Sequence, residues 1–352
     1  MMHFFSRRTF VKAASGLLVG AGLGDATFGI SHAYTAKRLL FNSSDSSSQV
    51  PDLLPRDSWM AYLSDNVQLA QLTIPGTHDS CCLGAGGPLV KCQDWSITDQ
   101  LNNGIRFLDI RVRRYESGFT IHHGPVYQGK TLTDVLNECI PFLQQHLSEC
   151  IIMSIKTEEG NGGLFDAPPP YNPTYSTVGE TFEKTYMGQY YYNGLSNVPI
   201  WYIEGGNPQL GQVRGRIVLF NRFQDYEPIV GLGPYTWPDN TTFERSGSSG
   251  YYIVEDNYNI PTLFATPKKK EAIWQNMKSA AKKSLTDDWY ITFTSGSSLG
   301  APPNYVAQEV NKWLQDVPSG LDPNEHNRIG IVPMDFPDVS NIDWLISWNQ
   351  MA

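Results

Sequence analysis

Short apolar runs alternate with amphipathic segments over most of the chain. The strand candidates are LAQLTI, IRFLDI, FTIHH, CIIMSIK, RIVLFN, YYIVED, WYITFTS and RIGIVPMDF. Three segments between them carry apolar residues at helical spacing: TLTDVLNECIPFLQQHL, PKKKEAIWQNMKSAAKKSL and PNYVAQEVNKWLQDV. Apolar strands that alternate with helices predict a parallel sheet covered by helices.

About eight such strands predict an α/β fold of the distorted (β/α)₈ TIM-barrel type. The barrel is expected to be irregular, because residues 224–250 read as loop where a helix is due. An open, doubly wound sheet is the alternative, but no G-x-G-x-x-G motif follows an early strand. A single domain over residues 57–352 is the simplest organisation.

Charged or imidazole side chains appear where these strands end. They are His78 and Asp79 after LTIP, Arg111, His122 and His123, Lys156, Arg222, Asp256 and Asp335. In a barrel the carboxyl ends of the strands meet at one rim, where active sites are built. The pattern therefore predicts that these side chains share a site.

The residue types at this rim favour phosphodiester cleavage by proton transfer. Two imidazoles can act as base and acid, because their pKa values lie near neutrality. Arg and Lys favour an anionic group, and Arg can bind phosphoryl oxygens through two donors. A His-rich rim can also hold zinc, but Arg111 and Lys156 would oppose a bound dication. We therefore expect no metal and no other cofactor in the reaction.

The N-terminal segment predicts export. Residues 1–33 contain SRRTFVK, which fits a twin-arginine signal through Arg7 and Arg8, followed by a short apolar stretch and SHA at 31–33. Residues 34–56 are rich in Ser and Pro and are expected to be a linker. The mature protein is expected to be secreted.

Charge and cysteine content limit the possible partners, metal sites and disulfides. The net charge of −9 argues against a nucleic-acid partner, which would require clustered Lys and Arg. All five cysteines lie between residues 81 and 150, without zinc-site spacing. Export permits disulfides between Cys82 and Cys92 or between Cys139 and Cys150, and the sequence leaves both open.

Six motifs occur in an order that resembles the catalytic domain of bacterial phosphatidylinositol-specific phospholipases C. They are TIPGTHDS, RFLDIRV, IHHGPVY, IIMSIK, WPDN and VEDNY, and the resemblance runs from about residue 57 to 345. It implies a distorted barrel that cleaves phosphatidylinositol to diacylglycerol and 1D-myo-inositol 1,2-cyclic phosphate without metal. It also implies a monomer that meets phosphatidylinositol or a GPI-type lipid at a membrane surface.

The same resemblance implies roles for the catalytic residues. His78 would take the proton of the inositol 2-hydroxyl, and Asp335 would hold its imidazole. Arg111 would stabilise the charge on the phosphate. His123 would protonate the diacylglycerol oxygen, helped by Asp79.

Four further residues are implied to bind the inositol. Lys156, Arg222 and Asp256 would contact its hydroxyl groups, and Tyr258 would stack on its ring. Relatives carry exposed Trp residues on rim segments that enter lipid. Here Trp95 lies close to the next helix and the loop at 295–305 has no Trp, which leaves membrane lipid, GPI anchors and soluble glycerophosphoinositol all open as substrates.

Other polar residues near these motifs are expected to be structural. His122 alternates with His123 along a strand and is expected to face away from the site. Asp109 is expected to orient its neighbours, and Glu158 to be solvated in a loop. Trp237 and Asp239 are assigned to a turn.

Two rival functions fit parts of the pattern. One is a metal-dependent glycerophosphodiester phosphodiesterase on a similar barrel. The other is a non-catalytic module that binds inositol phosphate or glycan. A binding module has no need of an acid–base pair, so it does not explain the two candidate histidines.

Overall fold

The computed structural model describes residues 54–158, 172–188, 199–223, 230–248, 250–282, 287–315 and 328–349. The predicted signal peptide and nearly all of the predicted linker lie outside these ranges. Among the described residues, no helix combines the length and apolar character needed to span a bilayer.

Within the described residues, the sheet contains eleven strands. They are β1 (Ile74–Thr77), β2 (Phe107–Tyr115), β3 (Gly118–His123), β4 (Val126–Thr131), β5 (Ile151–Thr157), β6 (Trp201–Tyr202), β7 (Ile217–Arg222), β8 (Thr242–Gly247), β9 (Gly250–Glu255), β10 (Trp289–Thr292) and β11 (Ile331–Met334).

The described helices include α, 3₁₀ and π types. They are η1 (Arg56–Tyr62), η2 (Leu69–Gln71), α3 (Ile97–Asn102), α4 (Leu132–Gln145), α5 (Val178–Phe182), η3 (Glu183–Met187), α6 (Leu210–Val213), η5 (Leu263–Ala265), α7 (Thr266–Lys282), α8 (Pro303–Gln315) and α9 (Val339–Ser347). The three helices predicted from apolar spacing correspond to α4, α7 and α8 and are confirmed.

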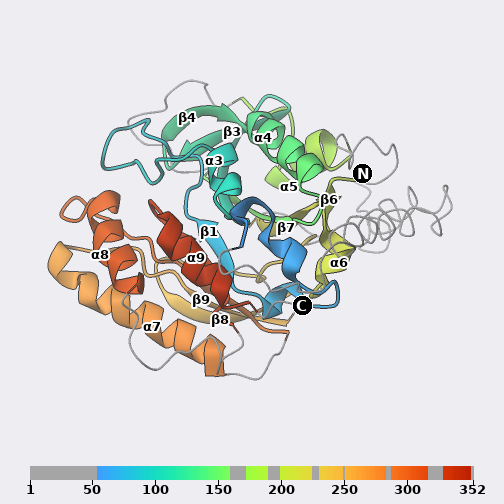
Figure 1. Ribbon diagram of the computed structural model, residues 1–352. Coiled ribbons are helices and arrows are strands. Elements are labelled where there is room, and N and C mark those ends of the chain that lie inside the picture. The colour runs from blue at the N-terminus through green and yellow to red at the C-terminus, as the bar shows by residue number, and fades with distance from the viewer. Residues whose placement is uncertain are drawn as a thin grey trace, which may run out of the picture.

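Neighbouring strands follow the order β6-β7-β5-β2-β1-β11-β10-β9-β8. From β6 to β9 in this order, every neighbouring pair is parallel. Strands β5 and β7 are almost wholly buried, as expected for parallel strands covered on both faces. Helices α4, α7 and α8 lie outside the strands, and the last helix, α9, packs beside β1 (Figure 1).

Among the described residues, isolated bridges close the sheet between β7 and β8. Leu232 pairs with Phe220 of β7, and Pro234 pairs with Gly247 of β8. The described residues 230–248 hold no helix, as predicted, but the prediction of loop throughout 224–250 was wrong for Thr242–Gly247, which form β8 and pair antiparallel with β9. Residues 224–229 and 249 lie outside the described ranges. The predicted distorted barrel is confirmed, and this region is where it departs from regular alternation.

The FTIHH segment does not belong to the parallel set. Strand β2 runs on past its parallel neighbours, and β3 returns antiparallel to it with Val112 opposite Ile121. The return places His123 beside the middle of β2. The prediction that His123 marks the end of a parallel strand was wrong, because a hairpin brings it back to the rim.

Local signals fix where several helices begin. Thr131 caps α4 by accepting from the backbone N–H of Asp134, whose carboxylate accepts from the Thr131 N–H in turn. Asp338 caps α9, just beyond β11, by accepting from the Asn341 N–H at 2.9 Å. The Asp338 cap fixes the turn that follows Asp335, so it helps to position one of the predicted site residues.

Candidate active site

The ends of β1 and β11 bring His78 and Asp335 together. Thr77 and Met334 are paired across these parallel strands, so the residues that follow them are also neighbours. His78 Nδ1 lies 2.8 Å from Asp335 Oδ1. The Gln93 side-chain amide donates to the carbonyl oxygens of His78 at 2.6 Å and of Met334 at 2.9 Å, which ties both strand ends to one point. Sequence reasoning missed Gln93, which has no motif of its own.

The hydrogen bonds of His78 define its tautomer. Arg111 Nη2 lies 2.6 Å from His78 Nε2, and a guanidinium has no acceptor. Nε2 therefore accepts, and the single ring proton stays on Nδ1, where it is donated to Asp335. The result is a neutral imidazole whose basic lone pair faces Arg111.

Asp79 and His78 contact different nitrogens of the Arg111 guanidinium, Nη1 and Nη2 respectively. The Asp79 backbone adopts φ of 44°, a left-handed conformation that Asp tolerates better than most residues. This turn separates its side chain from that of His78. The carboxylate is buried, with Oδ2 lying 3.2 Å from His123 Nδ1 and 3.5 Å from Arg111 Nη1.

His123 is held in its charged form. Burial lowers its pKa, but the Asp79 charge and the contact with Cys82 outweigh burial and raise the pKa to about 9. The Val90 carbonyl oxygen, 3.0 Å from Nδ1, adds a second acceptor there. The site thus contains one imidazole whose Nε2 atom accepts a hydrogen bond from Arg111 and one whose raised pKa favours the protonated form.

Arg111 is surrounded by three carboxylates. Its guanidinium lies 3.2 Å from Asp109 and 3.5 Å from both Asp79 and Glu158. Burial raises the pKa of Asp109, but Arg111 and Arg222 outweigh burial and hold that pKa well below its usual range. The three acids fix the guanidinium in place, while 13% of the side chain stays exposed.

A second group of side chains extends the rim. Arg222 lies 3.3 Å from Asp109 and 3.9 Å from Asp256, and its guanidinium stacks 3.7 Å above the Trp237 ring. Trp237 Nε1 donates to Asp256 at 2.8 Å. The assignment of Trp237 to a mere turn was therefore wrong, since its ring supports two of the predicted ligand-binding residues.

Lys156 and Tyr258 also have acidic partners. Lys156 donates to Glu158 at 3.0 Å, and Tyr258 donates to Asp239 at 2.9 Å. Burial and the Asp239 carboxylate raise the pKa of Tyr258 to about 12. Glu158 is buried rather than solvated, which corrects the expectation from sequence.

The structure therefore brings the predicted site residues to one rim. His122 faces away, as expected, with Nε2 lying 3.2 Å from Thr120 Oγ1 in the interior. Asp109 orients Arg111 and Arg222, also as expected. Glu158 had no sequence signal because it resembles a loop acid, whereas Trp237 belongs to the WPDN motif but was assigned to a turn.

Two of the cysteines lie beside His123. The Cys82 Sγ atom is 3.4 Å from His123 Nδ1, and both Cys82 and Cys92 contact the Val90 carbonyl oxygen. A hydrogen bond with Cys92 lowers the pKa of Cys82, burial raises it, and the contact with His123 lowers it again. The resulting pKa is about 7. All five cysteines are free thiols.

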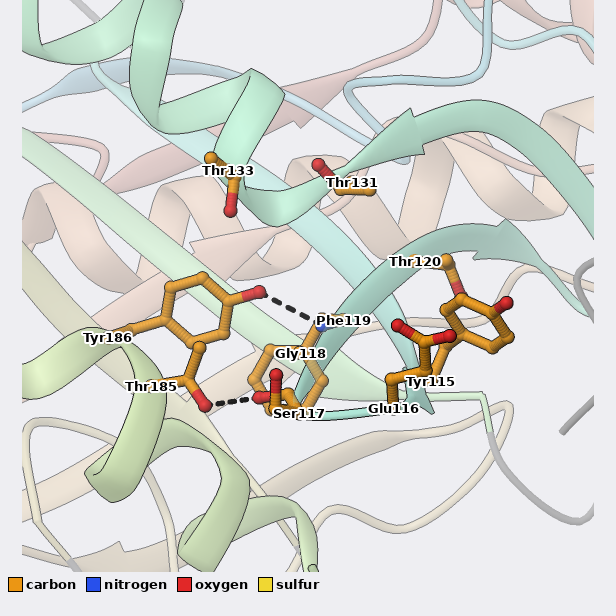
Figure 2. A pocket seen from close by; sticks show the side chains of 10 residues that line it. All are labelled: Tyr115, Glu116, Ser117, Gly118, Phe119, Thr120, Thr131, Thr133, Thr185 and Tyr186. Atoms are coloured by element: carbon orange, nitrogen blue, oxygen red, sulfur yellow. Dashed lines mark hydrogen bonds between the residues drawn. The ribbon is translucent and has the colours of Figure 1, made fainter. Parts of the chain in front are cut away.

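The site is distinct from a cavity of about 260 Å³ on the hairpin side of the barrel. Figure 2 shows that cavity between the β2–β3 turn, the start of α4 and η3, with the Tyr186 hydroxyl accepting from the Phe119 N–H. None of the predicted site residues lines it. A smaller cavity, of about 20 Å³, touches Arg222 and Trp237 at the rim.

Known proteins share both the motifs and the fold. The family model described as phosphatidylinositol-specific phospholipase C, X domain, matches residues 72–223. A 1-phosphatidylinositol phosphodiesterase of Staphylococcus aureus (strain Newman) is 30% identical over 307 residues, which cover 84% of this chain and 91% of that protein. The protein of the same name from Listeria monocytogenes is 28% identical over 299 residues, covering 83% of this chain and 84% of the relative.

Solved structures of proteins from the same family have a similar fold. A phosphatidylinositol-specific phospholipase C from S. aureus superposes with a TM-score of 0.70 at 26% identity, covering 84% of this chain and 98% of that one. The L. monocytogenes enzyme gives a TM-score of 0.62 at 26% identity, covering 85% of this chain and 100% of that one.

Proposed function

Because the chain belongs to the bacterial phosphatidylinositol-specific phospholipases C, we propose that it cleaves phosphatidylinositol to diacylglycerol and 1D-myo-inositol 1,2-cyclic phosphate without a metal ion. One observation supports this most strongly. His78 Nε2 accepts from the fixed guanidinium of Arg111, and the Asp79 carboxylate contacts both that guanidinium and His123, so two imidazoles and one cation are held together at the rim.

The first half of the reaction uses His78. The inositol 2-hydroxyl replaces Arg111 as the donor to His78 Nε2 and gives up its proton there, while its oxygen attacks phosphorus. Asp335 stabilises the imidazolium that forms, through the Nδ1 proton it already accepts. Because the attack is intramolecular, positioning alone can be worth an effective molarity of ~10⁵ M or more.

The second half uses Arg111 and His123. Arg111 donates to the phosphoryl oxygens as negative charge builds on them. The bond between phosphorus and the glycerol oxygen breaks, and His123 gives its proton to that oxygen. Asp79 holds His123 protonated beforehand, so the leaving group departs as a neutral alcohol.

The second group at the rim fits the inositol ring. Lys156, Arg222 and Asp256 offer charged donors and acceptors for ring hydroxyls. Tyr258, with 38% of its surface exposed, offers a flat face for stacking. We assign inositol recognition to these four residues.

The rival metal-dependent phosphodiesterase is separated from this proposal by chelation. We expect the protein to cleave phosphatidylinositol at full rate after treatment with EDTA. Loss of turnover in EDTA, with recovery on adding a divalent cation, would favour the rival. A binding module would give no turnover in either condition.

The fall of activity at alkaline pH is expected to follow the loss of the His123 proton. Above a pH of about 9 His123 loses its proton, so we expect kcat/KM to fall there, because the leaving oxygen is no longer protonated. In Asp79→Asn the charge that raises this pKa is gone, and the fall should move down by about one pH unit or more. A pH–rate profile of both proteins measures this. Asp239→Asn, the control, should leave the position of the fall unchanged, and an unmoved fall in Asp79→Asn would contradict the assignment.

Two exposed apolar side chains lie beyond the carboxyl ends of β9 and β10. Phe264 is 95% exposed and Leu299 is 89% exposed. The loops that carry them are in contact, since Ser298 donates to the Pro261 carbonyl oxygen at 3.2 Å. We propose that this pair enters the lipid surface in place of the Trp residues that are absent here.

Removing the pair should weaken binding to vesicles. Full burial of a side chain of this kind is worth about 1.5–3 kcal/mol. We expect Phe264→Ala with Leu299→Ala to bind phosphatidylinositol vesicles at least about tenfold more weakly in a sedimentation assay. Tyr251→Ala, at the opposite end of β9, is the control and should bind normally. Equal binding by the double variant would place the lipid surface elsewhere.

Export remains part of the proposal. The SRRTFVK motif within residues 1–33 supports passage through the twin-arginine route, so the enzyme would act outside the cell. Retention of an Arg7→Lys, Arg8→Lys variant inside the cell tests it, and normal secretion of that variant would contradict it.

A further inference from the structure

Four atoms of the kinds that bind transition metals meet on the inner side of His123. They are an Asp79 carboxylate oxygen, the Sγ atoms of Cys82 and Cys92, and His123 Nδ1, and all lie within 4.8 Å of one another. Asp79, Cys82 and Cys92 are buried, and His123 is partly exposed. The proposed reaction uses two of these residues and leaves both thiols unexplained.

The spacing is close to that of a zinc shell. Tetrahedral zinc, with bonds of about 2.0–2.3 Å, separates nitrogen from oxygen by about 3.4 Å and sulfur from nitrogen by about 3.6 Å. The free protein has 3.2 Å between His123 Nδ1 and Asp79 Oδ2, and 3.4 Å between Cys82 Sγ and His123 Nδ1. Small outward shifts of these atoms are therefore enough to admit the ion.

Arg111 Nη1, which lies 3.5 Å from Asp79 Oδ2, is a positive group that opposes a cation here. Two thiolates and the Asp79 carboxylate carry three negative charges, so a bound Zn²⁺ still leaves one negative charge to balance Arg111.

The other surroundings of this cluster suit a cation. Neither carboxylate oxygen of Asp79 accepts an aligned hydrogen bond from the described part of the chain, although the group is buried. The Val90 carbonyl oxygen lies 2.9 Å from Cys82 Sγ, 3.2 Å from Cys92 Sγ and 3.0 Å from His123 Nδ1. This oxygen therefore lies close to three of the four ligand atoms and could bind the ion as a fifth ligand.

We propose that Asp79, Cys82, Cys92 and His123 form a binding site for Zn²⁺, and that Zn²⁺ bound there inhibits phosphodiester cleavage. Two thiolates, one imidazole and one carboxylate select zinc over Ca²⁺ or Mg²⁺, which prefer oxygen ligands. The thiol protons and the Nδ1 proton of His123 are released to solvent as the ion binds.

The inhibitory part rests on the proposed function. With Nδ1 bound to the metal, His123 is no longer an imidazolium. Its remaining proton, on Nε2, can leave only by forming an imidazolate, which is a far more costly step. Asp79 is occupied at the same time, so the leaving oxygen loses its proton donor.

Metal binding is tested without reference to activity. The full chain, reduced with a phosphine and freed of metal with EDTA, is titrated with Co²⁺ and then with Zn²⁺. We expect one Co²⁺ per chain, with thiolate-to-cobalt charge-transfer absorption that Zn²⁺ abolishes. Cys92→Ser should lose the charge-transfer signal of a two-thiolate site, and Cys139→Ala, on α4, should keep it. Absence of metal uptake, or an unchanged spectrum in Cys92→Ser, would overturn the site.

Inhibition is tested by comparing each protein with itself in EDTA and in Zn²⁺. General acid catalysis contributes about 10²–10⁴-fold, so Zn²⁺ should slow cleavage of phosphatidylinositol by about 10²-fold or more, and Cys92→Ser should escape this loss. An aryl inositol phosphodiester, whose leaving group needs no proton, should be inhibited much less. Equal inhibition of the cleavage of both substrates would show that Zn²⁺ does not act by removing the proton of His123. Absence of cleavage in EDTA would instead refute the proposed function, while the cobalt spectrum would still decide the metal site.

Discussion

Replacing His78 with alanine is expected to lower kcat for phosphatidylinositol by about 10³–10⁴-fold, the upper part of the range for a general base. The neutral imidazole accepts at Nε2 and donates at Nδ1 to Asp335, so it is set to take a proton from the inositol 2-hydroxyl. The inositol contacts proposed for Lys156 and Arg222 do not depend on His78. We therefore expect binding of inositol, measured by calorimetry, to change by no more than about threefold.

His146→Ala is the matched control for this substitution. His146 stacks on Phe142 at the end of α4, outside the site, and its loss should leave kcat nearly unchanged. Turnover in His78→Ala close to that of the unaltered protein would refute the assigned mechanism. Parallel loss of inositol binding would show that His78 binds rather than catalyses.

Replacing Arg111 with lysine is expected to lower kcat/KM by about 10²–10³-fold, the usual cost of losing a fixed donor to a developing oxyanion. Lysine keeps the positive charge that balances Asp79, Asp109 and Glu158, so the fold should survive. It lacks the planar pair of donors that can contact two phosphoryl oxygens. Alanine would remove a cation that three buried carboxylates share, and the resulting loss of stability would confuse the kinetic comparison.

The matched control is Arg114→Lys on the same strand. Arg114 donates to the Tyr175 carbonyl oxygen at 2.9 Å, away from the rim, and its substitution should leave kcat/KM within about twofold of the original value. Steady-state kinetics and thermal unfolding of both variants measure the effect. Full activity in Arg111→Lys would mean that charge alone suffices and that paired donors are not needed.

The sequence could predict the site because residues that directly follow neighbouring parallel strands of a barrel lie close together in space. His78 and Asp335 are separated by 257 positions, yet each directly follows a strand, and those strands are parallel neighbours. The strand-end pattern needs only strand locations, which apolar runs reveal well. It succeeded for Lys156 and Arg222 for the same reason, since their strands are also paired.

The same reasoning failed where the chain leaves the regular pattern. His123 reaches the rim through an antiparallel hairpin, and apolar periodicity does not distinguish a returning strand from a parallel one. Glu158 lies one residue past β5 and resembles a solvated acid, although two cations hold it in the interior. Burial of an acid depends on partners far apart in the sequence, and local pattern does not contain them.

The cysteines illustrate a further limit. Cys82 and Cys92 lack any recognised metal-ligand spacing. A loop returns Cys92 to the Cys82 backbone, where its N–H donates to the Cys82 carbonyl oxygen at 3.0 Å, and the hairpin then adds His123. A cluster assembled from a loop and a hairpin becomes visible only once the tertiary structure is known.

Metal-free attack by the inositol 2-hydroxyl is tested most directly by ³¹P NMR of phosphatidylinositol digestion in EDTA. We expect the signal of inositol 1,2-cyclic phosphate to appear first and to remain the main product while substrate is consumed, because the neighbouring hydroxyl attacks faster than water. Acyclic inositol 1-phosphate as the first product, or no product until a divalent cation is added, would contradict the metal-free mechanism through His78, Arg111 and His123.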